Sequence, residues 1–417
     1  MDIQNFSALF NTPARREAFL KLIKDNKTKH IFIQGLEGSS IALFFSNLLE
    51  HKQAHIIIAN DLDEAGYLYN DLVQINGNDH ILLFPSGYKR DIKYGQPDPP
   101  SEILRTEVLN RLCQKGESLL IVTYPEAIAE KVVPVNMLSE QTLHIDKNSK
   151  CDIITLSDKL RERGFEEVDY VYEPGQFAVR GSILDVFSYT NELPYRIDFF
   201  GKEVESIRTF EVETQLSTGK LEEVYIVANV CGQEASGISI LDFIDKNTIL
   251  ICHNLSWVID RISTIASESL SEQTLIAEEG DRYAMQKIID VTAFQKKITT
   301  FQRIDYGASS EANAPAAIRF NCAPQGVYHK NFDLVSQSFS QFIEKGYTLY
   351  ILSDSEKQIE RLQAIFEERG DSISFTPVLK TLHEGFVDND LKIGCFTDHQ
   401  IFDRFHKYTL KSEHARS

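Results

Sequence analysis

Paired cysteines and long apolar runs are both missing from this 417-residue chain. Its six cysteines, at positions 113, 151, 231, 252, 322 and 395, stand singly, with no C-x-x-C pair and no histidine at ligand spacing. This pattern predicts reduced, mostly buried thiols of a cytoplasmic protein. No apolar run approaches the length of a membrane span, so we expect no membrane anchor.

Positive charge is scarce as well. Lys and Arg total 43 against 61 Asp and Glu, which gives a formal net charge of -18. A negative surplus opposes non-specific attraction to a phosphate backbone, so binding of nucleic acid by this chain alone is disfavoured. A basic protein surface is a more natural partner.

Arrangements typical of catalysis are absent too. No Ser/His/Asp or Cys/His constellation stands out, and the 11 histidines are dispersed along the chain. We therefore expect no catalytic residue and no metal site.

The segment from Gln34 to Ala42, QGLEGSSIA, lies between a strand-like run and a helix-like run. In a phosphate loop of the form G-x-x-x-x-G-K-[ST], the lysine holds the phosphate charge and the hydroxyl holds magnesium. Here the first glycine is kept and the last three positions are Ser40, Ile41 and Ala42. An ordinary Gly-Ser turn before a buried helix is the alternative. We expect a degenerate nucleotide loop that binds no ATP, formed by Gly35, Gly38, Ser39, Ser40 and Ile41.

The N-terminal part reads as an α/β domain. Apolar, strand-like runs at 29–34, 54–60, 81–85 and 118–123 alternate with helical patterns. Such alternation predicts a parallel sheet covered on both faces. We assign residues 1–136 to the first part of a degenerate helicase-like domain and residues 233–280, with a buried-strand run at 247–252, to its continuation.

Residues 137–232 have a different character. Short strand-like runs follow one another at tight turns, with no room for crossover helices, so they must pair antiparallel. Residues 281–325 are polar and alanine-rich, which predicts a linker, and residues 326–417 form another βαβ pattern. The expected fold class is α/β: a degenerate P-loop, RecA/helicase-like parallel-sheet domain with an inserted small α+β antiparallel domain and a further small α/β domain.

One stretch is specific enough to carry a family resemblance. Residues 168–187 read VDYVYEPGQFAVRGSILDVF, followed by PYRIDFFG at 194–201 and ESIRTF at 205–210. This run resembles the domain that bacterial transcription-repair coupling factors (Mfd) share with the excision-repair helicase subunit UvrB. The Gly35 loop, the Phe84-Pro85 strand end and the run Gly385-Phe386-Val387 are also similar to that family.

The resemblance implies a function. In that family the N-terminal module is a UvrB-like body without an ATP site, and its small domain recruits UvrA in nucleotide excision repair. The domain for RNA polymerase and the DNA-translocating motors, with their ATP and magnesium, would follow Ser417, and the UvrA surface would be masked by contact with that C-terminal region. The alternatives are an active ATP-dependent helicase or UvrB-type enzyme fragment, and a DNA-binding scaffold.

Arg180 is the residue expected to contact UvrA. A guanidinium at a turn between two strands is held rigidly and can bind a partner carboxylate through two hydrogen bonds. Phe177 is either an apolar anchor beside it or part of the small domain's own core. The complete expected UvrA-binding set is Arg180, Phe177, Gln176, Glu173, Glu167 and Phe187.

Overall fold

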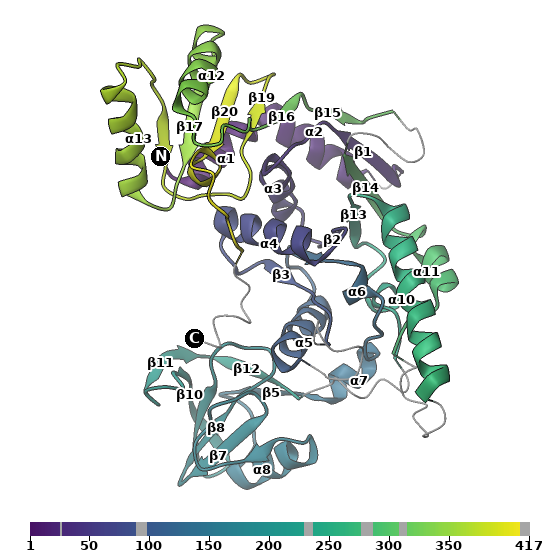
Figure 1. Ribbon diagram of the computed structural model, residues 1–417. Helices are drawn as coiled ribbons and strands as arrows, with labels where there is room; N and C mark the ends of the chain where they lie inside the picture. The colour runs from purple at the N-terminus through teal and green to yellow at the C-terminus, as the bar shows by residue number, and fades with distance from the viewer. Residues whose placement is uncertain (26, 89–97, 229–236, 277–286, 308–314, 409–417) are drawn as a thin grey trace.

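The computed structural model describes residues 1–25, 27–88, 98–228, 237–276, 287–307 and 315–408. These residues form an elongated molecule with a central α/β body, a small antiparallel domain at one end and a second α/β domain at the other (Figure 1). The predicted fold class is therefore confirmed. No helix of the described residues is both long and apolar enough to span a membrane.

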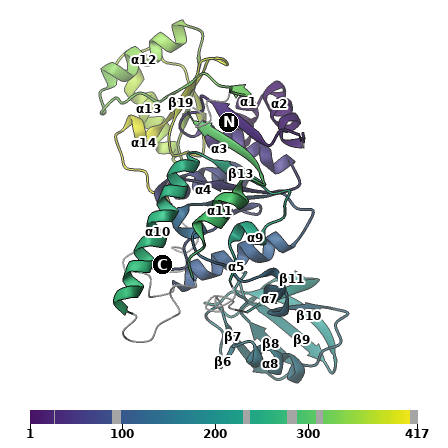
Figure 2. The same cartoon turned by 90° about the vertical axis from the view of Figure 1, so that its right-hand side faces the viewer.

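The central sheet has the strand order β15-β1-β14-β13-β2-β4-β3, and every neighbouring pair is parallel. Most residues of the inner strands β2, β4 and β13 are apolar on both faces because helices cover both sides of the sheet. Helices α3 and α4 lie on one side, and α10 and α11 lie on the other (Figure 1, Figure 2). The strands are β1 (His30–Gln34), β2 (Ala54–Ile58), β3 (Ile81–Leu83), β4 (Leu119–Thr123), β13 (Ile249–Cys252), β14 (Gln302–Gly307) and β15 (Ile318–Arg319).

The helices around this sheet begin at regular capping signals. Asp61 caps α4 by accepting a hydrogen bond from the Glu64 amide, and Asp290 caps α11 in the same way through the Ala293 amide. The helices of the body are α1 (Ile3–Phe10), α2 (Pro13–Lys24), α3 (Ser40–Phe45), the 3-10 turn η1 (Ser46–Glu50), α4 (Leu62–Asn76), α5 (Pro99–Cys113), α6 (Pro125–Ile128), α7 (Val135–Glu140), α9 (Ile240–Phe243), α10 (Leu255–Ile276) and α11 (Val291–Ile298).

The linker predicted over residues 281–325 is wrong where the structure describes it. Residues 302–307 form β14, an inner strand between β1 and β13. Its polar appearance comes from Arg303 and Asp305, which pair with each other at 3.0 Å, while Asp305 also contacts His30 at 2.5 Å. Arg303 and Asp305 lie two residues apart on one face of β14, and charged side chains that pair with each other can occupy an inner sheet position. Residues 281–286 and 308–314 lie outside the described part.

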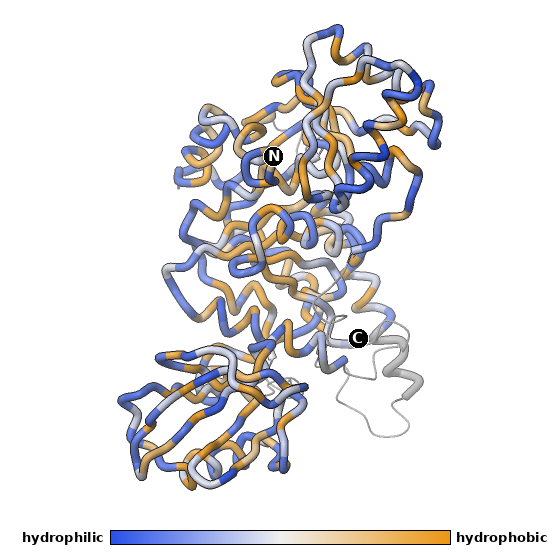
Figure 3. Tube along the Cα trace, turned by 90° about the vertical axis from the view of Figure 1, so that its left-hand side faces the viewer, coloured by the Kyte–Doolittle hydropathy of each residue, from blue (hydrophilic) through white to orange (hydrophobic). Residues whose placement is uncertain are grey.

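The small domain has a sheet of order β11-β10-β9-β8-β7-β6 and a separate pair of β5 with β12. All pairs are antiparallel except β6 with β7. Alternate residues of its strands are apolar, which is visible as alternating colours in Figure 3. Its elements are β5 (Thr142–Asp146), α8 (Ile153–Glu162), β6 (Glu166–Glu167), β7 (Gln176–Arg180), β8 (Ile183–Val186), β9 (Tyr195–Phe200), β10 (Glu203–Phe210), β11 (Ser217–Leu221) and β12 (Glu223–Val227).

The C-terminal domain has a mixed sheet of order β16-β19-β20-β17-β18. It packs directly on the N-terminal helices: Arg15 binds the fully buried Asp388 at 2.6 Å, and the rings of Phe10 and Phe386 meet edge to face. The two domains therefore share one hydrophobic core. The elements are β16 (Cys322–Pro324), α12 (Phe332–Glu344), β17 (Thr348–Leu352), α13 (Glu356–Glu368), β18 (Thr376–Val378), β19 (Phe386–Asp388), β20 (Ile393–Thr397) and α14 (Asp398–Ile401).

Candidate functional site

Two regions carry the residues singled out from the sequence: the Gly35–Ser39 loop and one face of the small domain. The loop leaves the carboxyl end of β1 and turns into α3. Gly35 has φ +92°, and a Cβ there would lie 1.8 Å from the carbonyl oxygen of Phe320. Gly38 has φ +55°, and a Cβ there would lie 2.7 Å from the carbonyl oxygen of Gly385. Both glycines are therefore required by backbone that passes over the loop.

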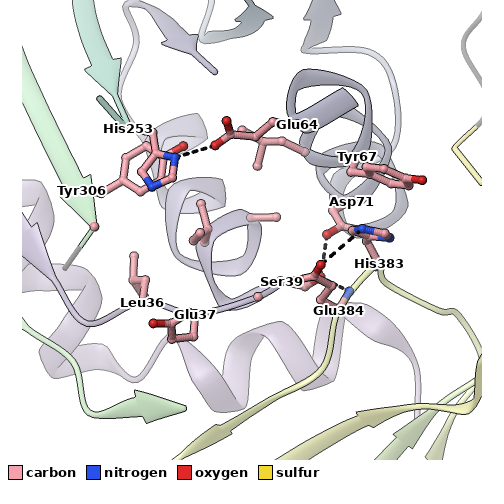
Figure 4. A pocket seen from close by; sticks show the side chains of 15 residues that line it. Leu36, Glu37, Ser39, Glu64, Tyr67, Asp71, His253, Tyr306, His383 and Glu384 are labelled. Carbon is pink, nitrogen blue, oxygen red and sulfur yellow. Dashed lines mark hydrogen bonds and ion pairs between the residues drawn. The ribbon is translucent and has the colours of Figure 1, made fainter. Parts of the chain in front are cut away.

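The C-terminal domain bonds to this loop through its residues 383 and 384. The Ser39 amide donates to the Glu384 carbonyl at 2.9 Å, and the Glu384 amide donates back to the Ser39 hydroxyl at 2.9 Å. The Ser39 hydroxyl in turn donates to Asp71 at 2.6 Å, and Asp71 also accepts from the His383 amide at 2.8 Å (Figure 4). Ser40 donates its hydroxyl hydrogen to the Glu37 carbonyl at 2.6 Å. The polar groups of the two serines are thus engaged within the protein.

A cavity of about 460 Å³ remains beside the loop, at the carboxyl edge of the sheet. This is the edge where ligands bind in open α/β sheets. No lysine or arginine is among the residues that line it, so it lacks the permanently charged side chains that hold phosphates. The lining residues are Leu36, Glu37, Gly38, Ser39, Ile41, Ala42, Glu64, Tyr67, Leu68, Asp71, His253, Tyr306, Gly307, His383 and Glu384.

The titratable groups of the cavity are shifted in ways that follow from burial and pairing. Desolvation raises the pKa of Asp71 to about 7, because the hydrogen bonds from the Ser39 hydroxyl and the His383 amide offset the loss of water only in part. The Glu64 carboxylate accepts a hydrogen bond from His253 Nδ1 at 2.7 Å, which raises the pKa of that histidine. Four of the lining residues carry carboxyl groups, Glu37, Glu64, Asp71 and Glu384, so the cavity is acidic.

The small-domain sheet has one face that packs on α8 and one that faces away from it. The face away from α8 is basic, in contrast to the acidic cavity. Phe177, Leu184 and Ile197 pack in one core with α8, so residues alternating with them lie on the other face. The register aligns Ala178 with Asp185, Asp185 with Arg196, Arg196 with Arg208, and Arg208 with Lys220. A row of basic side chains therefore crosses the sheet from β9 to β11.

Asp185 organises one end of this row. Its side chain is 1% exposed and lies 2.7 Å from Arg180 and 2.9 Å from Arg196. Arg180 also stacks over the ring of Tyr170, with the guanidinium carbon 4.9 Å from the ring centre. Arg180 remains 38% exposed, whereas Arg196 is 12% exposed. Arg180 is thus held rigidly while part of its guanidinium faces solvent.

The other end of the row is not neutralised. Arg208 has no ion pair among the residues that the structure describes, and its Nε is buried without a hydrogen-bond partner. Arg196 stands directly opposite it, and like charges in that position destabilise a sheet. The face therefore carries surplus positive charge on a chain whose net charge is -18.

The expected UvrA-binding set is only partly brought to the surface. Phe177 is 0% exposed and belongs to the core, and Phe187 is 6% exposed in a second cluster with Val171 and Phe210. Neither phenylalanine forms the expected exposed contact with a partner. Phe177 packs in the core with α8, which is the second of its two alternatives, whereas Phe187 belongs to the other cluster and is covered by Val171 and Phe210. Gln176 accepts hydrogen bonds from the amides of Tyr172 and Glu173 and so shapes a turn.

The remaining residues of that set are exposed. Glu173 lies at the surface, and Glu167 is exposed and pairs with Arg161 at 2.6 Å. Sequence reasoning missed Arg196, Arg208 and Tyr170. The period-2 pattern of YRIDFF and ESIRTF could have placed both arginines on the face away from the core.

By its fold, this chain is a helicase-like α/β protein with inserted small domains, one of which bears a basic outer face. The family model of the UvrB interaction domain matches residues 143–230, which is the small domain. Over 92% of its length the chain is 22% identical to a transcription-repair-coupling factor of Staphylococcus aureus (strain MRSA252), of which it covers 39%. Over 85% it is 20% identical to that of Staphylococcus epidermidis (strain ATCC 12228), of which it covers 35%.

These comparisons confirm the resemblance to transcription-repair coupling factors that the sequence predicted. The chain spans about two fifths of the length of the curated relatives it matches. The match to the interaction domain covers Arg180, Asp185, Arg196 and Arg208 together.

Proposed function

We propose that this chain is a non-catalytic recruitment module of a transcription-repair coupling factor, which binds UvrA during nucleotide excision repair. The observation that carries the proposal is the basic face around Asp185, which lies within the match to the UvrB interaction domain. RNA polymerase and DNA are partners that we assign to other parts of the longer relatives.

The chemistry of the face supports protein binding. Asp185 fixes the guanidinium of Arg180 by an ion pair, and the Tyr170 ring supports it from the side. A fixed guanidinium loses little conformational entropy on binding and can hold a carboxylate through two hydrogen bonds. Arginine and tyrosine are also the residue types that most often dominate the energy of protein interfaces. The partner surface is accordingly expected to be acidic.

We also propose that the chain itself hydrolyses no ATP. The Gly35–Ser39 loop has no lysine, its serines are bonded within the protein, and the neighbouring cavity is acidic. Phosphoryl transfer depends on groups that neutralise phosphate charge. An active helicase is therefore the less favoured reading, and ATP-driven translocation with magnesium would belong to other segments of the longer relatives.

The test is the affinity of UvrA for the Arg180→Ala variant, measured by calorimetry. If Arg180 is an interface hot spot, we expect a loss of about 2 kcal/mol, which is roughly 30-fold in Kd. Arg208→Ala, which removes the surplus charge without breaking an ion pair, should weaken binding less, through the rate of association.

The matched control is Lys159→Ala, which removes one exposed positive charge from α8 on the opposite side of the domain. Its affinity for UvrA should equal that of the unsubstituted chain. Circular dichroism verifies folding of all three variants. Unchanged affinity in both arginine variants would reject this face as the UvrA surface.

A further inference from the structure

Three histidines from separate segments meet next to the docked loop. His383 lies in the segment between β18 and β19, His399 lies in α14, and His406 follows that helix. One ring nitrogen from each lies within 4.8 Å of the others. The three histidines are 16 and seven residues apart in the sequence, which is not a recognisable ligand spacing. The sequence therefore predicted no metal site, because it does not reveal that the fold brings these residues together. None of them takes part in the proposed function.

The spacing of the nitrogens suits a metal ion. His383 Nδ1 and His406 Nδ1 lie 3.1 Å apart. Two imidazole nitrogens bound to one tetrahedral ion at about 2.0–2.1 Å are separated by roughly 3.3 Å. These two nitrogens, which share a hydrogen bond, are therefore near the separation that a common ion would impose, whereas the His399 nitrogen, within 4.8 Å of both, must come closer.

His399 is oriented by contacts of the kind that support metal ligands. Its Nε2 lies 2.7 Å from the His383 carbonyl oxygen, which is a hydrogen-bond acceptor, so Nε2 carries the hydrogen. Nδ1 of the neutral ring then carries a lone pair, which the Thr381 hydroxyl approaches at hydrogen-bond distance, 3.4 Å, with Asp398 Oδ1 at 3.7 Å. A metal-binding histidine commonly donates its other N–H to a carbonyl in this way.

The surroundings favour neutral imidazoles and a bound cation. Burial lowers the pKa of both His383 and His406. Neutral imidazole is the form that binds metals. Three carboxylates lie near the cluster. Glu384 lies 3.5 Å from His383 Nε2, and Asp398 precedes His399 in the chain. Asp354 is close enough to His406 to interact with it electrostatically.

One rotation is required. The rings of His399 and His406 stack at 4.4 Å with an interplanar angle of 15°, so their lone pairs do not yet converge. His406 is the ring able to turn, because it is partly exposed and its segment is fastened by the backbone, with Tyr67 donating to the His406 carbonyl at 3.0 Å. The opposite face of the His383 ring is fixed by stacking on Tyr67 at 3.5 Å.

We propose that His383, His399 and His406 form a site for a divalent transition metal such as Zn²⁺, with water or the Glu384 carboxylate as a fourth ligand. Such an ion would link the segment that docks on Ser39 to α14 and to the residues that follow it. It would thereby fasten the C-terminal domain onto the Gly35–Ser39 loop. This role is independent of UvrA binding.

The test is a calorimetric titration of the metal-depleted chain with Zn²⁺, repeated with Co²⁺ and visible absorption spectroscopy. We expect one ion per chain and the d–d absorption of tetrahedral Co²⁺. His406→Ala and His399→Ala should each weaken binding more than about 100-fold, because loss of supporting groups alone costs about 10–100-fold. Circular dichroism verifies that each variant is folded.

The control is His329→Ala, which removes an exposed histidine of the same domain outside the cluster. It should bind Zn²⁺ like the unsubstituted chain. Absence of stoichiometric binding, or binding that survives both cluster substitutions, would overturn the proposal. Zn²⁺ should also raise the Tm of the unsubstituted chain and not that of His406→Ala, and EDTA should reverse the rise.

Discussion

Two buried carboxylates, Asp71 beside the Gly35–Ser39 loop and Asp185 on the small domain, have opposite surroundings. Asp71 accepts from the Ser39 hydroxyl and the His383 amide, and burial raises its pKa to about 7. Asp185 is bound by the guanidinium groups of Arg180 and Arg196. The donors to Asp71 are bonded inside the protein, whereas Arg180, which donates to Asp185, keeps part of its guanidinium at the surface.

These opposite surroundings distinguish a structural polar cluster from a binding surface. At the loop, backbone and hydroxyl groups that could have held a ligand are bonded to the C-terminal domain. On the small domain, surplus positive charge is retained although Arg196 and Arg208 oppose each other across the sheet. A polar group with unused bonding capacity at the surface is the better indicator of a partner.

The largest effect that we expect comes from Asp185→Ala. This change leaves Arg180 and Arg196 without their carboxylate in a site where Asp185 is 1% exposed. Removing one member of a buried ion pair destabilises a protein by about 3 kcal/mol or more. Chemical denaturation measures the loss, and UvrA affinity should fall as well because Arg180 is no longer fixed.

The matched control for this prediction is Asp198→Ala on the same face. Asp198 is partly exposed and accepts a hydrogen bond from Ser182 at 2.9 Å. Its removal should cost less than about 1 kcal/mol. Equal losses in the two variants would mean that the ion pairs of Asp185 contribute no more to the free energy of unfolding than the single hydrogen bond of Asp198.

A smaller effect is expected from Ser39→Ala at the loop. The change removes a donor to the buried Asp71 and an acceptor for the Glu384 amide. Unsatisfied buried groups cost about 1–3 kcal/mol, so we expect a loss of about 2 kcal/mol in the free energy of unfolding. UvrA affinity should not change, since the loop belongs to the other domain.

Amide hydrogen exchange distinguishes docking from general stability. In Ser39→Ala the Glu384 amide should exchange faster, because its acceptor is gone. Ser40→Ala is the control, because the Ser40 hydroxyl bonds Glu37 within the loop. If both variants accelerate exchange at Glu384 equally, then Ser39 does not specifically hold the C-terminal domain.

Much of the fold could be predicted because its signals are local. The apolar runs of β1, β2 and β4 and the closely spaced strands of the small domain follow from periodicity and turn residues. Strand β14 was missed because Arg303 and Asp305 resemble a linker until their pairing with His30 is known. Its register depends on residues more than 270 positions away in the chain.

The candidate sites were less predictable, for the same physical reason. Arg180 could be chosen from its place at a turn, but the burial of Phe177 depends on which face of the sheet α8 covers. The docking of Glu384 on Ser39 joins residues 345 positions apart, and no local pattern encodes it. The meeting of His383, His399 and His406 likewise requires the folded C-terminal domain.

The smallest expected effect is that of Mg-ATP on the unsubstituted chain. A ligand at 100 times its Kd would stabilise the folded state by about 2.7 kcal/mol. We expect no shift in Tm and no binding heat at millimolar Mg-ATP. Ile41 lines the cavity where a phosphate loop has lysine, and Ala42 is 0% exposed where it has a hydroxyl.

Mg-sulfate at the same concentration controls for magnesium and ionic strength. A nucleotide-specific rise in Tm that disappears in a chain with Asp71→Asn or Glu64→Gln would put ATP in the acidic cavity and remove the contrast between the two regions. An unchanged Tm would support the view that the loop's bonding capacity is already used by Glu384 and Asp71. The capacity to bind a partner would then reside on the small domain, where the guanidinium of Arg180 is fixed but still exposed.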